Sequence, residues 1–380
     1  MPLTRLADLT DPALCPCLVV KVGSSLLVGA DGLRRDWIAG LVEEIAGCRA
    51  RGQNVIIVSS GAIALGAARL SLDKGGRGSL ADAQAAASVG QIALSGLWAD
   101  LLGRHDITAA QLLLTLDDLE DRRRYLNATA TLGRLIDAGA VPVINENDSV
   151  ATHEIRFGDN DRLAARVAQA VQASAVLLLS DVDGLFDRDP ADPAATLVRE
   201  VRGVTHEIKA MASGGSSSGL GSGGMISKLQ AAEIADMAGV SLAIVNGTHD
   251  RPIARAIDRE VGTLFLPPEG KRRRQAARKA WLGGRMKLKG ELVVDAGAAQ
   301  ALQGGSSLLA AGITTVRGAF QRGDPVGIVD GNGAVLAHGL SEYDADDCTK
   351  LIGKHSRQHE ALLGYAPRSA VVHRNQLVLK

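Results

Sequence analysis

The sequence is short of aromatic residues, of cysteine and of net charge, and each shortage excludes a class of protein. Phe, Trp and Tyr together make up 3% of the 380 residues, which leaves few rings on which nucleic-acid bases could stack. Lys plus Arg and Asp plus Glu number 42 each, so no overall field attracts nucleic acid or anionic lipid. Four cysteines are too few for a disulfide framework in a chain of this length.

The sequence also lacks segments that would direct it into a membrane. Residues 1–10 contain Arg5 and Asp8 and no apolar stretch typical of a secretory signal. No apolar run approaches the ~20 residues that cross a bilayer. Only one residue separates Cys15 from Cys17, where zinc sites prefer two or more, and no second pair follows. We therefore expect a reduced, cytoplasmic protein that makes no membrane contact.

What is present is the pattern of an α/β protein with more than one domain. A chain of 380 residues exceeds what one hydrophobic core usually supports. Up to residue 265, short apolar runs alternate with amphipathic helical segments, which predicts a mainly parallel sheet in a three-layer αβα sandwich. The expected strands are 18–22, 55–59, 112–114, 141–144, 176–179 and 242–245. The expected helices are 34–51, 82–102, 122–138, 162–172 and 226–237.

The pattern changes near Pro267 and predicts a smaller second domain. Residues 271–284 are rich in Lys and Arg, which indicates a solvated linker, with a phosphate-binding patch as the alternative. Beyond them, short β-type runs alternate with Gly-rich turns, as in a small, mostly β, barrel-like domain. We place the domains at 1–270, 271–284 and 285–380. The strands expected in the last are 291–294, 312–316, 326–329, 334–337 and 370–372.

A Gly- and Ser-rich run, Ser213 to Lys228, is the most informative segment of the chain. A loop nearly bare of side chains lets backbone N–H groups converge on an anion, and the helix expected to follow it also favours negative charge at its N-terminus. Lys228 at that junction completes a phosphate cradle. A flexible linker is the alternative interpretation.

Five further polar segments follow predicted strands or precede a predicted helix. The carboxyl ends of parallel strands lie at one edge of a sheet, where ligands bind. Taken alone, each segment also fits a strand end, a tight turn or a helix N-cap. Together with the Gly- and Ser-rich run, they supply two lysines, Lys21 and Lys228, with carboxylates and polar acceptors, which suits phosphoryl transfer. The segments are Lys21–Ser25, Ser59–Ala62, Asn145–Ser149 with Gly158–Asp161, and Ser180–Phe186.

These residues carry a resemblance to the bacterial glutamate 5-kinases, a family with an amino acid kinase domain followed by a PUA domain. The Gly221–Ala232 segment resembles the family's own version of the loop. Ser180 stands where the family often has Thr, and Ser213–Ser218 is richer in Gly and Ser than usual. The other matching segments are Lys21–Ser25, Ser60–Ala64, Asn145–Asp148, Gly158–Asp161, Gly290–Ala298 and Gly304–Leu309.

The resemblance implies that ATP phosphorylates the side-chain carboxylate of L-glutamate, the first step of proline biosynthesis. It assigns Lys21 and Lys228 to the transferring phosphoryl group, and Asp161 to holding their ammonium groups. Magnesium is expected through the ATP phosphates, with no protein ligand identified. Glutamate would be bound by Ser60, Asp148 and Asn160. ATP would be bound by Lys21, Ser180, Asp181, Ser222, Gly223, Gly224, Met225, Ile226, Ser227 and Lys228.

Members of the family are typically inhibited by L-proline and typically form homo-oligomers, so we expect both here. One alternative is an amino acid kinase that acts on acetylglutamate or UMP. Another is an RNA-binding protein acting through the PUA domain, for which the cluster Lys271–Arg274 leaves a weak RNA contact open.

Overall fold

The computed structural model describes residues 3–29, 32–150, 159–213, 222–267, 288–368 and 370–380. The chain divides into two units, residues 1–120 with 127–269 and residues 121–126 with 270–380. The expected boundary at 270 and the expected linker 271–284 lie outside the described residues.

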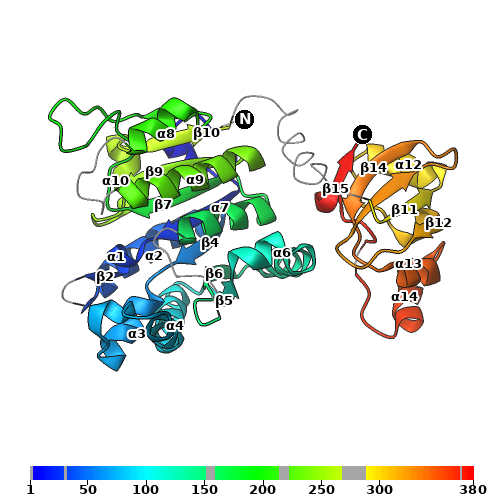
Figure 1. The fold of residues 1–380 in the computed structure, drawn as a ribbon, viewed down its shortest axis with the longest axis horizontal. Coiled ribbons are helices and arrows are strands. Elements are labelled where there is room, and N and C mark those ends of the chain that lie inside the picture. Colours follow the sequence, from blue (N-terminus) through cyan, green and yellow to red (C-terminus); the bar gives the residue numbers. More distant parts are fainter. Residues whose placement is uncertain (1–2, 30–31, 151–158, 214–221, 268–287, 369) are drawn as a thin grey trace. The chain divides into compact units, whose positions relative to one another are not determined.

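The first unit contains an eight-stranded sheet in the order β5-β6-β4-β1-β7-β9-β10-β8 (Figure 1). The first six strands in that order are parallel, as expected. At the far edge, β10 runs antiparallel to β9 and pairs with β8. These two short strands were not predicted. The strands are β1 (Cys17–Val22), β4 (Asn54–Ser59), β5 (Ala109–Leu114), β6 (Val141–Glu146), β7 (Ala175–Ser180), β8 (Glu200–Arg202), β9 (Ser241–Asn246) and β10 (Thr263–Leu266).

Helices cover both faces of this sheet. Helices α2, α4 and α10 share one core with the sheet, whereas α7 and α9 pack together and against strands on the other face. All five expected helices are confirmed. The helices are α1 (Ser24–Leu27), α2 (Arg35–Ala50), α3 (Ala62–Leu70), α4 (Leu80–Gly103), α5 (Leu116–Glu120), α6 (Arg122–Asp137), α7 (Asp159–Val171), α8 (His206–Ser213), α9 (Ser222–Ala238) and α10 (Pro252–Arg259), with a hairpin of β2 (Val28–Gly29) and β3 (Gly32–Leu33).

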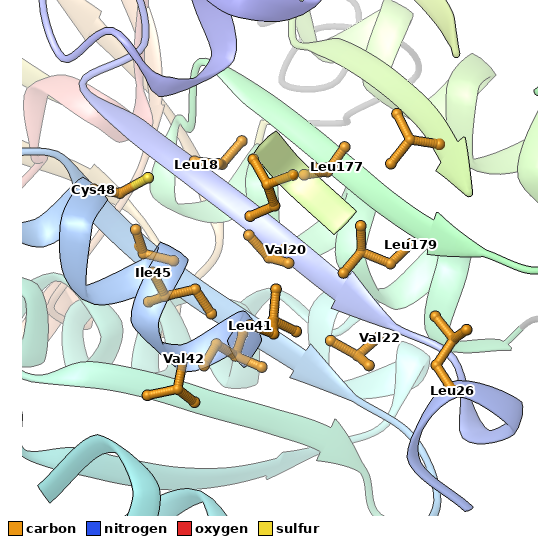
Figure 2. Packing of buried hydrophobic residues seen from close by; sticks show 14 of the residues in the cluster. Leu18, Val20, Val22, Leu26, Leu41, Val42, Ile45, Cys48, Leu177 and Leu179 are labelled. Carbon is orange, nitrogen blue, oxygen red and sulfur yellow. The ribbon is translucent and has the colours of Figure 1, made fainter. Parts of the chain in front are cut away.

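The core under α2 determines which way the side chains of β1 point. Figure 2 shows Val20 and Val22 of β1 beside Leu41 of α2, all of them buried. Successive side chains of a strand point to opposite faces. Lys21, between the two valines, therefore points to the face that α7 and α9 cover.

By length and composition, helix α4 could cross a membrane, although no apolar run of that length was expected from the sequence. Its residues Leu94, Trp98 and Leu101 are buried in the core of the first unit. The Trp98 indole donates a hydrogen bond of 2.9 Å to the Ser59 hydroxyl at the end of β4. Helix α4 is therefore a core helix, and its apolar sequence reflects packing.

The packing of α3 against α4 depends on glycine. A Cβ at Gly90 would lie 1.8 Å from the Ala62 carbonyl oxygen, and one at Gly66 would lie 1.7 Å from that of Ala86. Both obstacles are backbone atoms, which cannot rotate away. The two helices approach closely only because these positions lack side chains.

We expect Gly90→Ala to lower the free energy of unfolding by about 1–3 kcal/mol through overpacking. Gly96→Ala is a matched control on α4, because no atom beyond the local backbone of α4 lies within 4 Å of its added methyl group. At that site the helix propensity of Ala should stabilise the protein by up to about 1 kcal/mol. Urea unfolding of both variants measures the difference, and equal effects would contradict this account of the α3–α4 contact.

The second unit is mostly β, as expected, with a five-stranded sheet in the order β12-β11-β13-β14-β15. Four expected strands are confirmed, but the strand expected at 370–372 is wrong. Those residues are buried, and Val372 makes only an isolated bridge to Leu308. Their apolar character reflects core packing rather than sheet pairing. The elements are β11 (Gly290–Val294), β12 (Ile313–Gly318), β13 (Pro325–Val329), β14 (Val335–Leu340), β15 (Leu377–Leu379) and the unpredicted helices α12 (Ala296–Gln303), α13 (Ala345–Leu351) and α14 (Ser356–Leu363).

Candidate active site

The polar segments that follow the parallel strands lie at one edge of the sheet. Strands β1, β4, β6 and β7 are parallel and end at Val22, Ser59, Glu146 and Ser180. From β1 the chain first builds the β4 side of the sheet and later the β7 side, so the strand order reverses next to β1. Such a reversal is where open α/β sheets bind ligands.

A buried carboxylate lies between the two lysines that the sequence singled out. The Lys21 ammonium is 2.6 Å from Oδ1 of Asp161, and the Lys228 ammonium is 3.4 Å from Oδ2. The Ser227 hydroxyl lies 3.0 Å from the same Oδ2. Asp161 is 1% exposed, and both lysines are below 10%. Residues from β1, α7 and α9 thus form one buried charged cluster.

Asp161 stays ionised despite its burial. Desolvation by itself would raise its pKa, but the charges of Lys21 and Lys228 and hydrogen bonds from Lys21 and Ser227 outweigh it and hold the pKa below its ordinary value. A carboxylate with a lowered pKa is a poor proton acceptor at neutral pH. The cluster carries two positive groups for one negative group, which suits it to neutralising an additional anion.

A second cluster, beside the first along α7, is polar and uncharged. The Asn160 Nδ2 donates to the Ser60 hydroxyl at 2.8 Å and to the Asn145 Oδ1 at 3.0 Å. Two of the residues expected to bind glutamate, Ser60 and Asn160, are therefore in direct contact. The third, Asp148, is half-buried in the turn after β6, three residues beyond Asn145.

Two members of this polar cluster lay outside the expected set of site residues. Asn145 is 2% exposed, and its side chain donates to Oε1 of Gln91 at 2.8 Å. Asn145 belongs to the polar run Asn145–Ser149 that follows a predicted strand. Gln91 had no such signal, because it lies inside the helix expected at 82–102 and follows no predicted strand.

Apart from Lys21 on β1, the expected ATP-binding residues lie at the carboxyl end of β7 and at the start of α9. Ser180 is buried and its hydroxyl donates to the exposed Asp181 at 3.1 Å. Next to them, Asn246 of β9 donates to Asp183 at 2.8 Å, a contact that the sequence did not indicate. Helix α9 begins at Ser222, four residues before the expected start, so Ser222–Lys228 forms its first two turns rather than a loop.

The first N–H groups of a helix have no partner within it and attract anions, so this early start keeps the expected phosphate preference. Gly158 and residues 214–221, which belong to the expected segments, lie outside the described residues.

Comparison with known proteins agrees with this geometry. The Amino acid kinase family matches residues 16–246, and the PUA domain matches residues 290–363. The Glutamate 5-kinase of Novosphingobium aromaticivorans is 68% identical over 380 residues, with both chains covered completely. The chain belongs to the glutamate 5-kinase family. The resemblance drawn from the sequence is thereby confirmed.

Other members of the family match over nearly the whole chain. The Glutamate 5-kinase of Sphingopyxis alaskensis is 58% identical and covers 98% of this chain and 100% of its own. That of Zymomonas mobilis is 53% identical, with 97% and 92% covered. Among solved structures, carbamate kinase from Giardia lamblia bound to AMP-PNP covers 67% of this chain and 99% of its own, with 16% identity and a TM-score of 0.48.

Proposed function

We propose that this glutamate 5-kinase family member transfers the γ-phosphoryl group of ATP to the side-chain carboxylate of L-glutamate, the first step of proline biosynthesis. The observation that carries the proposal is Asp161 between Lys21 and Lys228, next to the Ser60–Asn160 pair. A positively charged cluster for phosphate thus adjoins a polar cluster for an amino acid. The names of the close relatives support the same substrate.

The reaction needs charge neutralisation more than proton transfer. A Glu-type carboxyl group titrates near ~4.3, so the acceptor is already ionised at pH 7. The difficulty is repulsion between an anionic nucleophile and a polyanionic phosphate. Lys21 and Lys228 would offset the charge on the transferring group, and Asp161 would fix the positions of their ammonium groups. No general base is required.

The remaining site residues divide between the two substrates. Ser60, Asp148 and Asn160 would bind glutamate, whereas Ser180, Asp181 and Ser222–Lys228 would bind ATP. Magnesium would neutralise charge on the ATP phosphates. Among the described residues, no group of three His, Cys, Asp or Glu side chains could hold a metal ion. Mg²⁺ often binds through substrate phosphates and waters, and then needs few protein ligands.

The domains and partners complete the proposal. We place the kinase domain at 1–270, a basic linker at 271–284 and the PUA domain at 285–380, consistent with the family matches. L-proline would act as a feedback inhibitor, and the protein would be a cytoplasmic homo-oligomer whose RNA contact, if any, is weak.

The decisive experiment offers glutamate, acetylglutamate, aspartate and UMP separately with Mg-ATP and hydroxylamine as a trap. We expect γ-glutamyl hydroxamate from glutamate, loss of the signal with EDTA, and inhibition by added L-proline. Sedimentation of the same sample measures the oligomeric state. Turnover of acetylglutamate or UMP without turnover of glutamate would overturn the substrate assignment. RNA binding without any ATP consumption would overturn the kinase activity.

A further inference from the structure

A chain of side-chain hydrogen bonds connects α4 to the polar cluster. It begins at Ser95, whose hydroxyl donates to the Gln91 carbonyl oxygen at 2.7 Å and accepts from the Gln91 Nε2 at 3.2 Å. The Gln91 Oε1 then accepts from Asn145 at 2.8 Å. Asn145 in turn accepts from Asn160, which donates to Ser60. Neither Ser95 nor Gln91 belongs to the proposed set of ligand-binding residues.

Each side-chain amide in this chain of hydrogen bonds has a fixed orientation of its oxygen and nitrogen atoms. The backbone N–H of Glu146 donates to the Asn145 side chain at 2.8 Å, so the atom that it meets must be Oδ1. The Asn145 Nδ2 therefore faces Gln91, which must present its oxygen. Gln91 can present its oxygen because its Nε2 donates to the Ser95 hydroxyl, which in turn donates its own hydrogen to the backbone carbonyl of Gln91. The donors and acceptors agree at each step.

The fixed direction determines what the site offers to a ligand. The Asn160 Nδ2 donates its two hydrogens to Ser60 and Asn145, so the Oδ1 of Asn160 faces away from both residues. That oxygen is buried and has no hydrogen-bond partner among the described residues. Burying a hydrogen-bond acceptor without a partner raises the free energy of the folded protein, and a bound N–H group would lower it again. The Ser60 hydroxyl accepts from Asn160, which leaves its hydrogen for an anionic oxygen.

We infer that Gln91 is a positioning residue that fixes the amide of Asn160 as an acceptor for the substrate α-ammonium group, while Ser60 donates to the α-carboxylate. This inference rests on the proposed assignment of Ser60 and Asn160 to glutamate. It adds a requirement for recognition, because a ligand needs both an ammonium donor and a carboxylate acceptor to form hydrogen bonds with Asn160 and Ser60. Gln91 reaches the site because Gly90 allows α4 to approach the start of α3.

The test replaces Gln91 with Met, which keeps the length of the side chain but removes the acceptor for Asn145. Loss of one hydrogen-bond partner at the bound amino acid should raise the KM for glutamate about tenfold. The KM for ATP should change by less than about twofold, because none of the residues assigned to ATP takes part in this chain of hydrogen bonds. Gln91→Glu keeps an oxygen facing Asn145 and should restore most of the affinity for glutamate.

Two serine variants provide a matched pair that does not remove Gln91. The hydroxyls of Ser88 and Ser95 both donate to the carbonyl four residues earlier in α4, at 2.8 and 2.7 Å. Only Ser95 also accepts from Gln91. Ser95→Ala should therefore raise the KM for glutamate by about threefold, a partial loss of one hydrogen bond, whereas Ser88→Ala should leave it unchanged.

The outcomes separate this inference from the proposed function. If the wild-type enzyme makes γ-glutamyl hydroxamate but folded Gln91→Met keeps the wild-type KM for glutamate, the positioning role of Gln91 is wrong. Equal increases in the KM values for glutamate and ATP would also overturn it, since they would indicate general damage. If the wild-type enzyme phosphorylates a different acceptor, the proposed function itself fails.

Discussion

Replacing Lys228 or Lys21 with Ala should lower kcat by about 10²–10³-fold, the usual cost of removing one preorganised donor to transition-state charge. The KM for glutamate should change much less, because both lysines face the charged cluster and not the Ser60–Asn160 pair. An interaction that strengthens only as charge develops in the transition state affects kcat rather than substrate binding.

Steady-state kinetics with glutamate and ATP varied separately measures this effect. Lys350→Ala is the matched control, since that lysine is exposed in the second unit and pairs with Asp347 at 2.8 Å. It should keep wild-type kcat. A large rise in the KM for glutamate, with kcat unchanged in Lys21→Ala or Lys228→Ala, would show that the lysines bind the ground state and would refute the proposed role.

Asp161→Asn should have the second large effect, on both activity and stability. Without the carboxylate, two buried ammonium groups lose their shared counter-ion. Breaking a buried ion pair in this way costs about 3–5 kcal/mol, so the unfolding free energy of the ligand-free protein should fall by roughly that amount. Misplaced lysines should also reduce kcat by about 10²-fold or more.

The pH dependence of that stability loss follows from the lowered pKa of Asp161. A carboxyl group whose folded-state pKa is depressed stabilises the fold fully above its unfolded value, near ~3.9, and loses this contribution as the pH falls through the folded pKa. The difference in unfolding free energy between wild type and Asp161→Asn should thus be constant at neutral pH and shrink in acid.

Urea unfolding at several pH values, together with the pH profile of kcat, tests both parts. Asp100→Asn is the control, because its ion pairs with Arg35 and Arg104 lie at the surface, where each such pair contributes about 0–1 kcal/mol. Since no base is needed, the kcat profile of Asp161→Asn should show no new acid limb. Activity that is lost at neutral pH and returns as the pH rises would instead mean that a proton acceptor takes part.

The sequence predicted the strands of the first unit well because each is a short apolar run between turn residues. It failed where that signal is short or misleading. Strands β8 and β10 contain three and four residues, and the apolar residues 370–372 are buried without forming a strand. The start of α9 was placed too late because Ser and Gly are poor helix formers, yet in the structure they begin the helix.

The sequence by itself determined which residue types follow each strand, and hence the kinds of groups available: two lysines, Asp161 and several amides. It could not determine that Lys21, Asp161 and Lys228 meet. The alternation of side chains along β1 sets Lys21 opposite its valine neighbours, but only the packing of α7 and α9 decides what lies on that side. Gln91 depends still more on tertiary structure, because a backbone contact at Gly90 brings one helical residue to the ends of distant strands.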